Sequence, residues 1–183
     1  MEWKKFAVET KNRNPWPLVT EAISISRCTG LALDIGSGGG ADSRAMNDAG
    51  FLVYAIDSEP QALRNVKGLG GIMPLKIDLA KEKSELPKGK YNMVVAYNSL
   101  PFFGRKNAFE IMSETKMRMS KRGVFVFSLF GKDDDFVKRK KAFSVTKEEI
   151  YRKFKGWEMV HFIEEHKTEG KKWHILKGIL RKR

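Results

Sequence analysis

The sequence predicts an α/β fold: a single domain built on a seven-stranded, mostly parallel sheet with helices on both faces. Short apolar runs alternate with helical patterns along the chain, as they do in βαβ units. The first apolar run, LALDI, leads directly into a loop that contains four glycines. The last two strand-like runs are separated by KTEGK, a length that suits an antiparallel hairpin.

Each element follows from a local pattern. Apolar runs predict the strands, at residues 31–36, 51–57, 72–79, 91–98, 123–130, 157–166 and 172–182. The run at 91–98 is apolar almost throughout, as expected of a strand covered on both faces. Helical patterns, closed by a glycine in the first and last case, predict helices at 41–50, 59–69, 104–121 and 146–156. Residues 1–17 are predicted to be irregular, because NPWP disfavours both a helix and a central strand.

Length and composition predict one domain, residues 1–183, without a linker or repeat. The apolar runs are too short to cross a bilayer, and we identify no signal peptide. The single cysteine, Cys28, excludes an internal disulfide framework and favours a reducing compartment. We therefore expect a cytoplasmic protein without membrane contact, either a monomer or a homodimer.

The net charge is +13, from 35 Lys and Arg against 22 Asp and Glu. Such an excess favours polyanionic partners, including nucleic acid. The basic residues are spread along the chain, and their densest groups, at 138–141 and 181–183, are not interleaved with aromatic residues. We therefore favour solubilising surface lysines and keep a nucleic-acid partner as the alternative.

The glycine-rich loop after the first strand indicates a binding site for a nucleoside-containing cofactor. In a parallel sheet, ligands bind beyond the carboxyl ends of the strands. Glycines such as Gly36, Gly38 and Gly40 let the backbone approach a ligand, and the helix that follows attracts negative groups. Asp57 and Ser58 end the second strand about 20 residues further on, where an acid usually binds the ribose hydroxyls.

The glycines alone fit two cofactors, and Asp34 distinguishes them. Gly36, Gly38 and Ala41 satisfy the dinucleotide pattern G-x-G-x-x-G/A, while Gly36, Gly38 and Gly40 satisfy the methyltransferase pattern. A carboxylate beside a pyrophosphate is unfavourable. The ammonium and sulfonium of S-adenosylmethionine (SAM) favour one, so Asp34 predicts SAM as the cofactor.

Residues after the third and fourth strands are expected to complete the pocket. Asp78 can accept a hydrogen bond from the adenine amine, and Leu79 can cover the ring. Tyr97 and Asn98 end the fourth strand and are placed near the transferable methyl group, with Tyr97 a candidate catalytic residue. Three aromatic residues are candidates for contact with the methyl acceptor, and the first belongs to a possible lid: Trp16, Phe102 and Phe103.

The ordered motifs LDIGSGGG, YAIDSEP, LKIDLA and YNMVVAYNSLPFF resemble those of the class I SAM-dependent methyltransferases. The resemblance covers about residues 15 to 183 and implies a Rossmann-like methyltransferase domain. More narrowly, the chain resembles the tellurite-resistance methyltransferases of the TehB type. It shares with them a C-terminal stretch in which a helix leads into GWE and a strand. In that group a His-Arg pair near the strand end is implicated with substrate, which implies such a role for His166 and Lys167.

The sequence thus predicts a SAM-dependent methyltransferase that acts on a small molecule, and the candidates include anionic and chalcogen-containing acceptors. The alternatives are a SAM-dependent RNA methyltransferase, suggested by the charge, and an NAD-dependent oxidoreductase, disfavoured by Asp34. A protein that binds the cofactor without turnover is a further alternative. No His, Cys and acid cluster has metal-ligand spacing along the chain, so no metal is expected.

Overall fold

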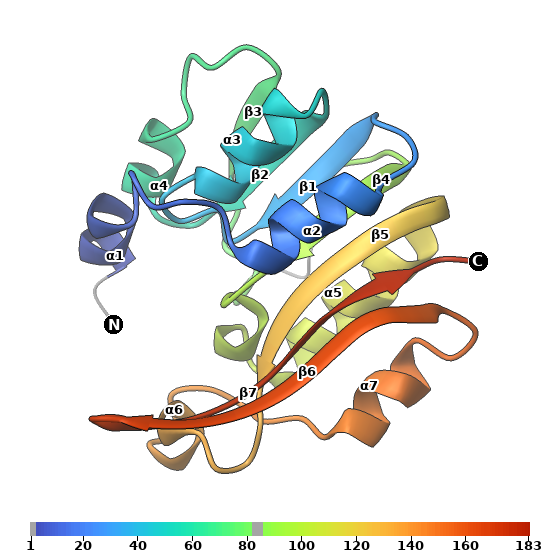
Figure 1. Cartoon of the computed structure of the whole chain (residues 1–183). Coiled ribbons are helices and arrows are strands. Elements are labelled where there is room, and N and C mark those ends of the chain that lie inside the picture. Colours follow the sequence, from blue (N-terminus) through green and yellow to red (C-terminus); the bar gives the residue numbers. More distant parts are fainter. Residues whose placement is uncertain (1–2, 82–85) are drawn as a thin grey trace.

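The computed structural model describes residues 3–81 and 86–183, which form one seven-stranded sheet. The strand order is β3-β2-β1-β4-β5-β7-β6. The first five strands along the chain pair in parallel, and β7 runs antiparallel between β5 and β6 (Figure 1). This confirms the predicted sheet and its terminal hairpin. The strands are β1 (Leu31–Ile35), β2 (Leu52–Asp57), β3 (Ile72–Lys76), β4 (Tyr91–Ala96), β5 (Met119–Phe130), β6 (Glu158–Glu169) and β7 (Lys171–Arg181).

Helices cover both faces of the sheet, because alternate strand residues point to opposite sides. On one face, Leu33, Val94 and Phe125 pack in a core with residues of α5 and α7. On the other face, Ala32 and Val95 pack with residues of α2 and α3. The helical segments are α1 (Trp3–Glu9), α2 (Pro17–Ile25), α3 (Ala41–Asp48), α4 (Pro60–Arg64), the 3₁₀ turn η1 (Leu100–Phe102), α5 (Arg105–Arg118), α6 (Asp135–Lys138) and α7 (Lys147–Lys153).

The prediction of an irregular segment at residues 1–17 is wrong for residues 3–9 and 17, and it is confirmed for residues 10–16. Trp3–Glu9 form the helix α1, and Pro17 begins α2, because proline is tolerated in the first turn of a helix. Tertiary contacts hold α1: Ala7 is buried, and its carbonyl accepts a hydrogen bond of 2.9 Å from the side-chain amide of Asn65. Packing of this kind depends on residues distant in sequence, so no local pattern revealed it.

Other element boundaries differ from the prediction by several residues. The helix α5 ends at Arg118, and β5 begins directly at Met119, although we expected the helix to reach 121. The hairpin strands extend through most of KTEGK, and Gly170 makes the turn with a φ of +69°. In residues 3–81 and 86–183, no helix is long and apolar enough to cross a bilayer.

The core beneath α5 and α7 gives a direct test of the fold. Phe125 is buried, stacks on Phe127 at 5.8 Å and contacts Phe154 at 5.3 Å between ring centroids. Phe125→Ala leaves a cavity and should lower the free energy of unfolding by about 3–5 kcal/mol. Met117→Ala, at a side chain that is 66% exposed, should change it by less than about 0.5 kcal/mol. Urea unfolding measures both, and equal losses would contradict the described core.

Candidate active site

The glycine-rich loop, residues 36–40, is fastened to the end of β2 by backbone hydrogen bonds. The N–H groups of Gly36 and Ser37 donate to the carbonyl of Ile56 at 2.8 and 3.0 Å. The N–H of Gly38 donates to Oδ2 of Asp57 at 2.9 Å. Gly36 has a φ of +76°, and a Cβ there would lie 2.5 Å from Cβ of Ser99. Glycine is therefore required at this position by the close approach of the loop to the end of β4.

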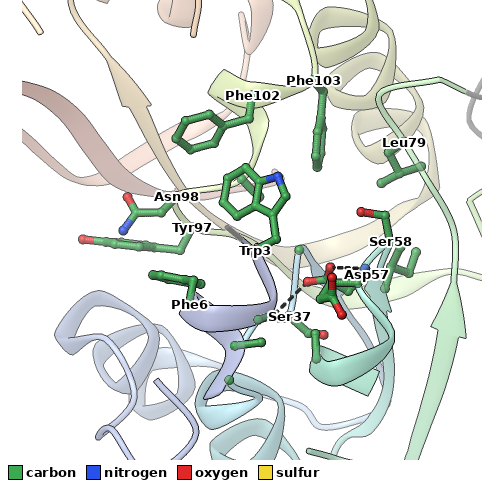
Figure 2. Close-up of a pocket in the computed structure, with 18 of the residues that line it drawn as sticks. Trp3, Phe6, Ser37, Asp57, Ser58, Leu79, Tyr97, Asn98, Phe102 and Phe103 are labelled. Atoms are coloured by element: carbon green, nitrogen blue, oxygen red, sulfur yellow. Dashed lines mark hydrogen bonds between the residues drawn. The ribbon is translucent and has the colours of Figure 1, made fainter. Parts of the chain in front are cut away.

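A cavity of about 490 Å³ opens beside this loop, at the carboxyl ends of β1, β2 and β4. Its volume falls within the range of small-molecule sites, about 300–1,000 Å³. The structure brings most of the sequence-predicted site residues together around it (Figure 2). The predicted residues that line the cavity are Trp16, Gly36, Gly38, Asp57, Ser58, Asp78, Leu79, Tyr97, Asn98, Phe102 and Phe103.

Four predicted residues do not line the cavity. Gly40, the last residue of the loop, directly precedes α3 and has a φ of +79°. Asp34 is buried beneath the loop, where the hydroxyl of Ser43 donates to its Oδ2 at 2.5 Å. His166 and Lys167 lie on the exposed part of β6, and Nζ of Lys167 is 3.2 Å from Glu165. We expected Asp34 to contact a bound cation directly, but its side chain does not face the cavity in this structure.

Burial raises the pKa of two carboxyl groups near the loop, Asp34 and Asp57. Burial raises the pKa of Asp34 to about 7, and the nearby Asp42 carboxylate adds to the rise. Burial also raises the pKa of Asp57, although hydrogen bonds from the N–H groups of Glu59 and Gly38 oppose the rise. Of these two groups, only Asp57 lines the cavity, where its carboxylate can accept hydrogen bonds from a ligand.

Sequence reasoning missed an ion pair at the mouth of the cavity. Arg13 donates through both terminal nitrogens to the carboxylate of Asp42, and the Nη1 bond is 3.3 Å long. The N–H of Trp16 donates to the same carboxylate at 2.9 Å. The guanidinium also lies 4.8 Å above the Trp16 ring, which stacks on Tyr97 at 4.9 Å. Arg13 and Asp42 are 29 residues apart, so no motif links them.

Aromatic side chains from α1 and η1 also line the cavity. Trp3 and Phe6 of α1 point into it, and Trp3 contacts Phe102 edge-on at 5.1 Å (Figure 2). Phe102 in turn contacts Phe130 and Phe136, each at 5.6 Å. The N-terminal segment therefore covers the cavity with a helix, whereas the sequence had suggested only Trp16.

The end of β4 holds two polar residues at the cavity wall. Burial raises the pKa of Tyr97 to about 12, with Glu165 adding to the rise, so its hydroxyl stays protonated near neutrality. Asn98 has a φ of +55°, a conformation that side-chain-bearing residues seldom adopt. The Ser128 hydroxyl accepts from the Asn98 N–H at 2.8 Å and donates to Oδ1 at 2.7 Å. These two hydrogen bonds to Ser128 of β5 hold the Asn98 side chain in place at the cavity.

Two unpartnered hydroxyl groups show whether the cavity suits a polar ligand such as a cofactor. Within the described part of the chain, the buried Oγ atoms of Ser37 and Ser99 have no hydrogen-bond partner. Both residues line the cavity. Buried polar groups without partners are rare in folded proteins, so a polar ligand suits this place.

Comparison with known families agrees with this geometry. The family described as "Tellurite resistance protein TehB" matches residues 6–175. The chain belongs to the TehB family. The resemblance expected from the motifs is thereby confirmed. A search of curated proteins finds no match to the chain.

Solved structures place this TehB family member among the methyltransferase folds. TehB from Haemophilus influenzae has a TM-score of 0.77 at 19% identity, over 98% of this chain and 67% of that one. The N-methyltransferase NodS from Bradyrhizobium japonicum WM9, in complex with S-adenosylhomocysteine (SAH), has a TM-score of 0.69 at 14% identity, over 100% and 99%. Magnesium protoporphyrin IX methyltransferase from Synechocystis PCC 6803, with bound SAM, has a TM-score of 0.64 at 18% identity, over 98% and 79%.

The buried carboxyl of Asp34 predicts a pH dependence of stability. Its pKa is about 7 in the folded chain against an ordinary 3.8, so the folded state binds the proton more tightly. This group's contribution to stability is therefore full below about pH 4 and declines as pH rises to about 7. Asp34→Asn should remove that decline, which is on the order of a few kcal/mol. Urea unfolding between pH 4 and 8 measures it, and parallel curves for both proteins would contradict the assignment.

Proposed function

We propose that this TehB family member binds SAM in the cavity and transfers its methyl group to a small-molecule acceptor. The observation that carries the proposal is the convergence of the glycine-rich loop, Asp57, Asp78 and Tyr97 on one cavity at the carboxyl ends of the parallel strands. Solved methyltransferases of the same fold hold SAM or SAH, according to their descriptions. We further propose that the protein acts in the cytoplasm.

Each part of SAM has a suitable partner in the cavity. Asp57 would accept hydrogen bonds from the ribose hydroxyls, and Leu79 with Asp78 would hold the adenine ring. The Arg13 guanidinium would bind the carboxylate of the methionine moiety, because its planar fork matches a carboxylate. The carboxylate of Asp42, which lines the cavity, would favour the ammonium group of the same moiety.

The cofactor supplies a methyl group that its sulfonium makes electrophilic, and the chain has to align the acceptor and exclude water. The aromatic faces of Trp3, Phe6 and Phe102 would exclude water, and aromatic rings also attract a cation. Tyr97 would position the acceptor as a hydrogen-bond donor, since its raised pKa prevents it from acting as a base near neutrality. His166 and Lys167 are left out of this proposal because neither lines the cavity.

The acceptor class follows from the ionisable groups at the aromatic end. The candidates there are Tyr97, which stays protonated, Arg13, which is always charged, and Asp42, which is paired with it. An oxygen or ammonium acceptor often requires a general base. A soft or anionic nucleophile requires none, which favours a chalcogen-containing or other anionic small molecule. The family's description, which names tellurite resistance, agrees with this class.

One cluster of basic residues does not favour RNA as the acceptor. A cluster of lysines lies at the C-terminal end of α5 and the start of β4, where Lys90, Lys116 and Lys182 donate to backbone carbonyls. This is the edge of the sheet opposite to the carboxyl ends that form the cavity. A polyanion bound there would not reach the proposed methyl group.

Titration and turnover test the proposal together. Isothermal titration calorimetry should show one SAM or SAH site per chain and no comparable binding of NADH. Incubation with SAM and a panel of acceptors, namely a thiol, selenite, tellurite, an amine and tRNA, should yield SAH with an anionic or chalcogen acceptor. Absence of SAM and SAH binding at millimolar ligand would contradict the proposal, and methylation of tRNA alone would replace it with the RNA alternative.

Arg13 tests the proposed orientation of the cofactor. Arg13→Gln should weaken SAM binding by about 10- to 100-fold, since hydrogen bonds to charged groups contribute about 1.5–3 kcal/mol. Arg105→Gln is the matched control, because Arg105 pairs with Glu149 and does not line the cavity. Calorimetry measures both variants, and thermal unfolding verifies that each is folded. An affinity of Arg13→Gln within twofold of the parent would exclude the proposed contact.

A further inference from the structure

The β6–β7 hairpin brings together three metal-ligating side chains outside the cavity. His166 lies directly opposite His174 in the antiparallel pairing, and their ring centroids are 3.9 Å apart. Asp133, in the segment between β5 and α6, comes to the same place, at the end of the hairpin that lies beside α6 (Figure 1). One ligand atom of each residue lies within 4.8 Å of the others. These three residues are far apart in the sequence and show no metal-ligand spacing. For that reason the sequence analysis predicted no metal site.

His174 is held in the orientation that a metal ligand needs. It is 6% exposed, and its Nε2 lies 2.9 Å from Oε1 of Glu164. A carboxylate only accepts hydrogen bonds, so Nε2 carries the proton in this contact and Nδ1 presents a lone pair. Metal-binding histidines characteristically donate their second N–H to a carboxylate in this way.

The Nδ1 atom of His174 faces a second acceptor. Oδ2 of Asp133 lies 3.7 Å from it, too far for a hydrogen bond. The hydrogen bond that Nδ1 accepts from the Asp133 N–H is long, at 3.4 Å. A cation placed between Nδ1 and Oδ2 would be bound by both acceptors. Ligands of a tetrahedral ion with bonds of about 2.0–2.1 Å are themselves about 3.3 Å apart.

The backbone of residues 131–134 packs closely against His174. The N–H of Gly131 donates to the His174 carbonyl at 2.7 Å, and the N–H of His174 donates to Oδ2 of Asp134 at 3.1 Å. A Cβ at Gly131 would lie 2.3 Å from Nδ1 of His174. Glycine at position 131 therefore leaves room for the His174 ring. The hydrogen bonds hold the segment that carries Asp133 against β7.

We propose that Asp133, His166 and His174 bind a late first-row divalent cation, for which Zn²⁺ is the test ion. Imidazole and carboxylate ligands suit Zn²⁺, and three protein ligands leave a fourth position for water. His166 is exposed and can turn its ring toward the ion, while His174 stays fixed by Glu164. The Lys138 ammonium lies 3.8 Å from Oδ1 of Asp133, which leaves Oδ2 for the metal.

The bound ion would connect the hairpin to the aromatic side of the cavity. Asp133 lies two residues before α6, whose Phe136 contacts both Trp173 of β7 and Phe102 at the cavity. Coordination would hold α6 against the hairpin and so restrict this aromatic wall. A ligand that binds the folded state alone also stabilises it against unfolding.

Binding of Zn²⁺ to the complete chain, with any affinity tag removed, tests the site. Calorimetry should give one Zn²⁺ per chain, and His166→Asn and Asp133→Asn should each weaken binding at least tenfold. His161→Asn is the matched control, because His161 lies on the same strand but contacts Glu21. This variant should bind Zn²⁺ with the affinity of the parent. Addition of Zn²⁺ should raise the melting temperature of the parent and of His161→Asn, but not of His166→Asn.

Cobalt substitution gives an independent measurement of the ligands. Co²⁺ bound to the parent should show the visible absorption of a tetrahedral or five-coordinate site, and His166→Asn should lose it. The proposal is overturned if the parent binds no Zn²⁺ at about 100 µM free Zn²⁺, which would half-saturate a site with a Kd of about 100 µM. Equal affinities of His166→Asn and His161→Asn would overturn it as well.

Discussion

The site depends on the attachment of the glycine-rich loop to the end of β2. Two N–H groups of the loop share the carbonyl of Ile56, and a third donates to the Asp57 carboxylate. These bonds force a tight turn with positive φ at Gly36, close against Ser99. Because β1 lies between β2 and β4 in the sheet, the turn sets the positions of both neighbouring strand ends. Asp57 and Tyr97 consequently face one cavity.

Burial determines what the charged groups of this cavity can do. Burial raises the pKa of the Asp34 carboxyl, sealed beneath the loop, to about 7, while Arg13 and Asp42 form an ion pair that lines the cavity. The aromatic end offers rings and a protonated phenol. In the proposed function, Arg13 would bind the amino-acid moiety of SAM, and the aromatic rings would exclude water around a nucleophile that is reactive without a base.

The parts of the structure that local patterns encode were predictable from the sequence. Apolar runs predicted the strands, and the rule that parallel strands present their carboxyl ends at one edge gathered Asp57, Asp78 and Tyr97 correctly around a cavity. Contacts between distant segments were not predictable. The helix α1 is held by Asn65, and Arg13 finds Asp42 across 29 residues. His166 was expected beside the acceptor, but the hairpin carries it past the cavity to His174 and Asp133.

A crystal structure with SAH tests the central claim most directly. The account predicts electron density for the nucleoside in the cavity, with the ribose hydroxyls on Asp57, the adenine against Leu79 and the amino-acid carboxylate on Arg13. An empty cavity in crystals soaked at millimolar SAH, or a ligand bound elsewhere on the chain, would contradict it.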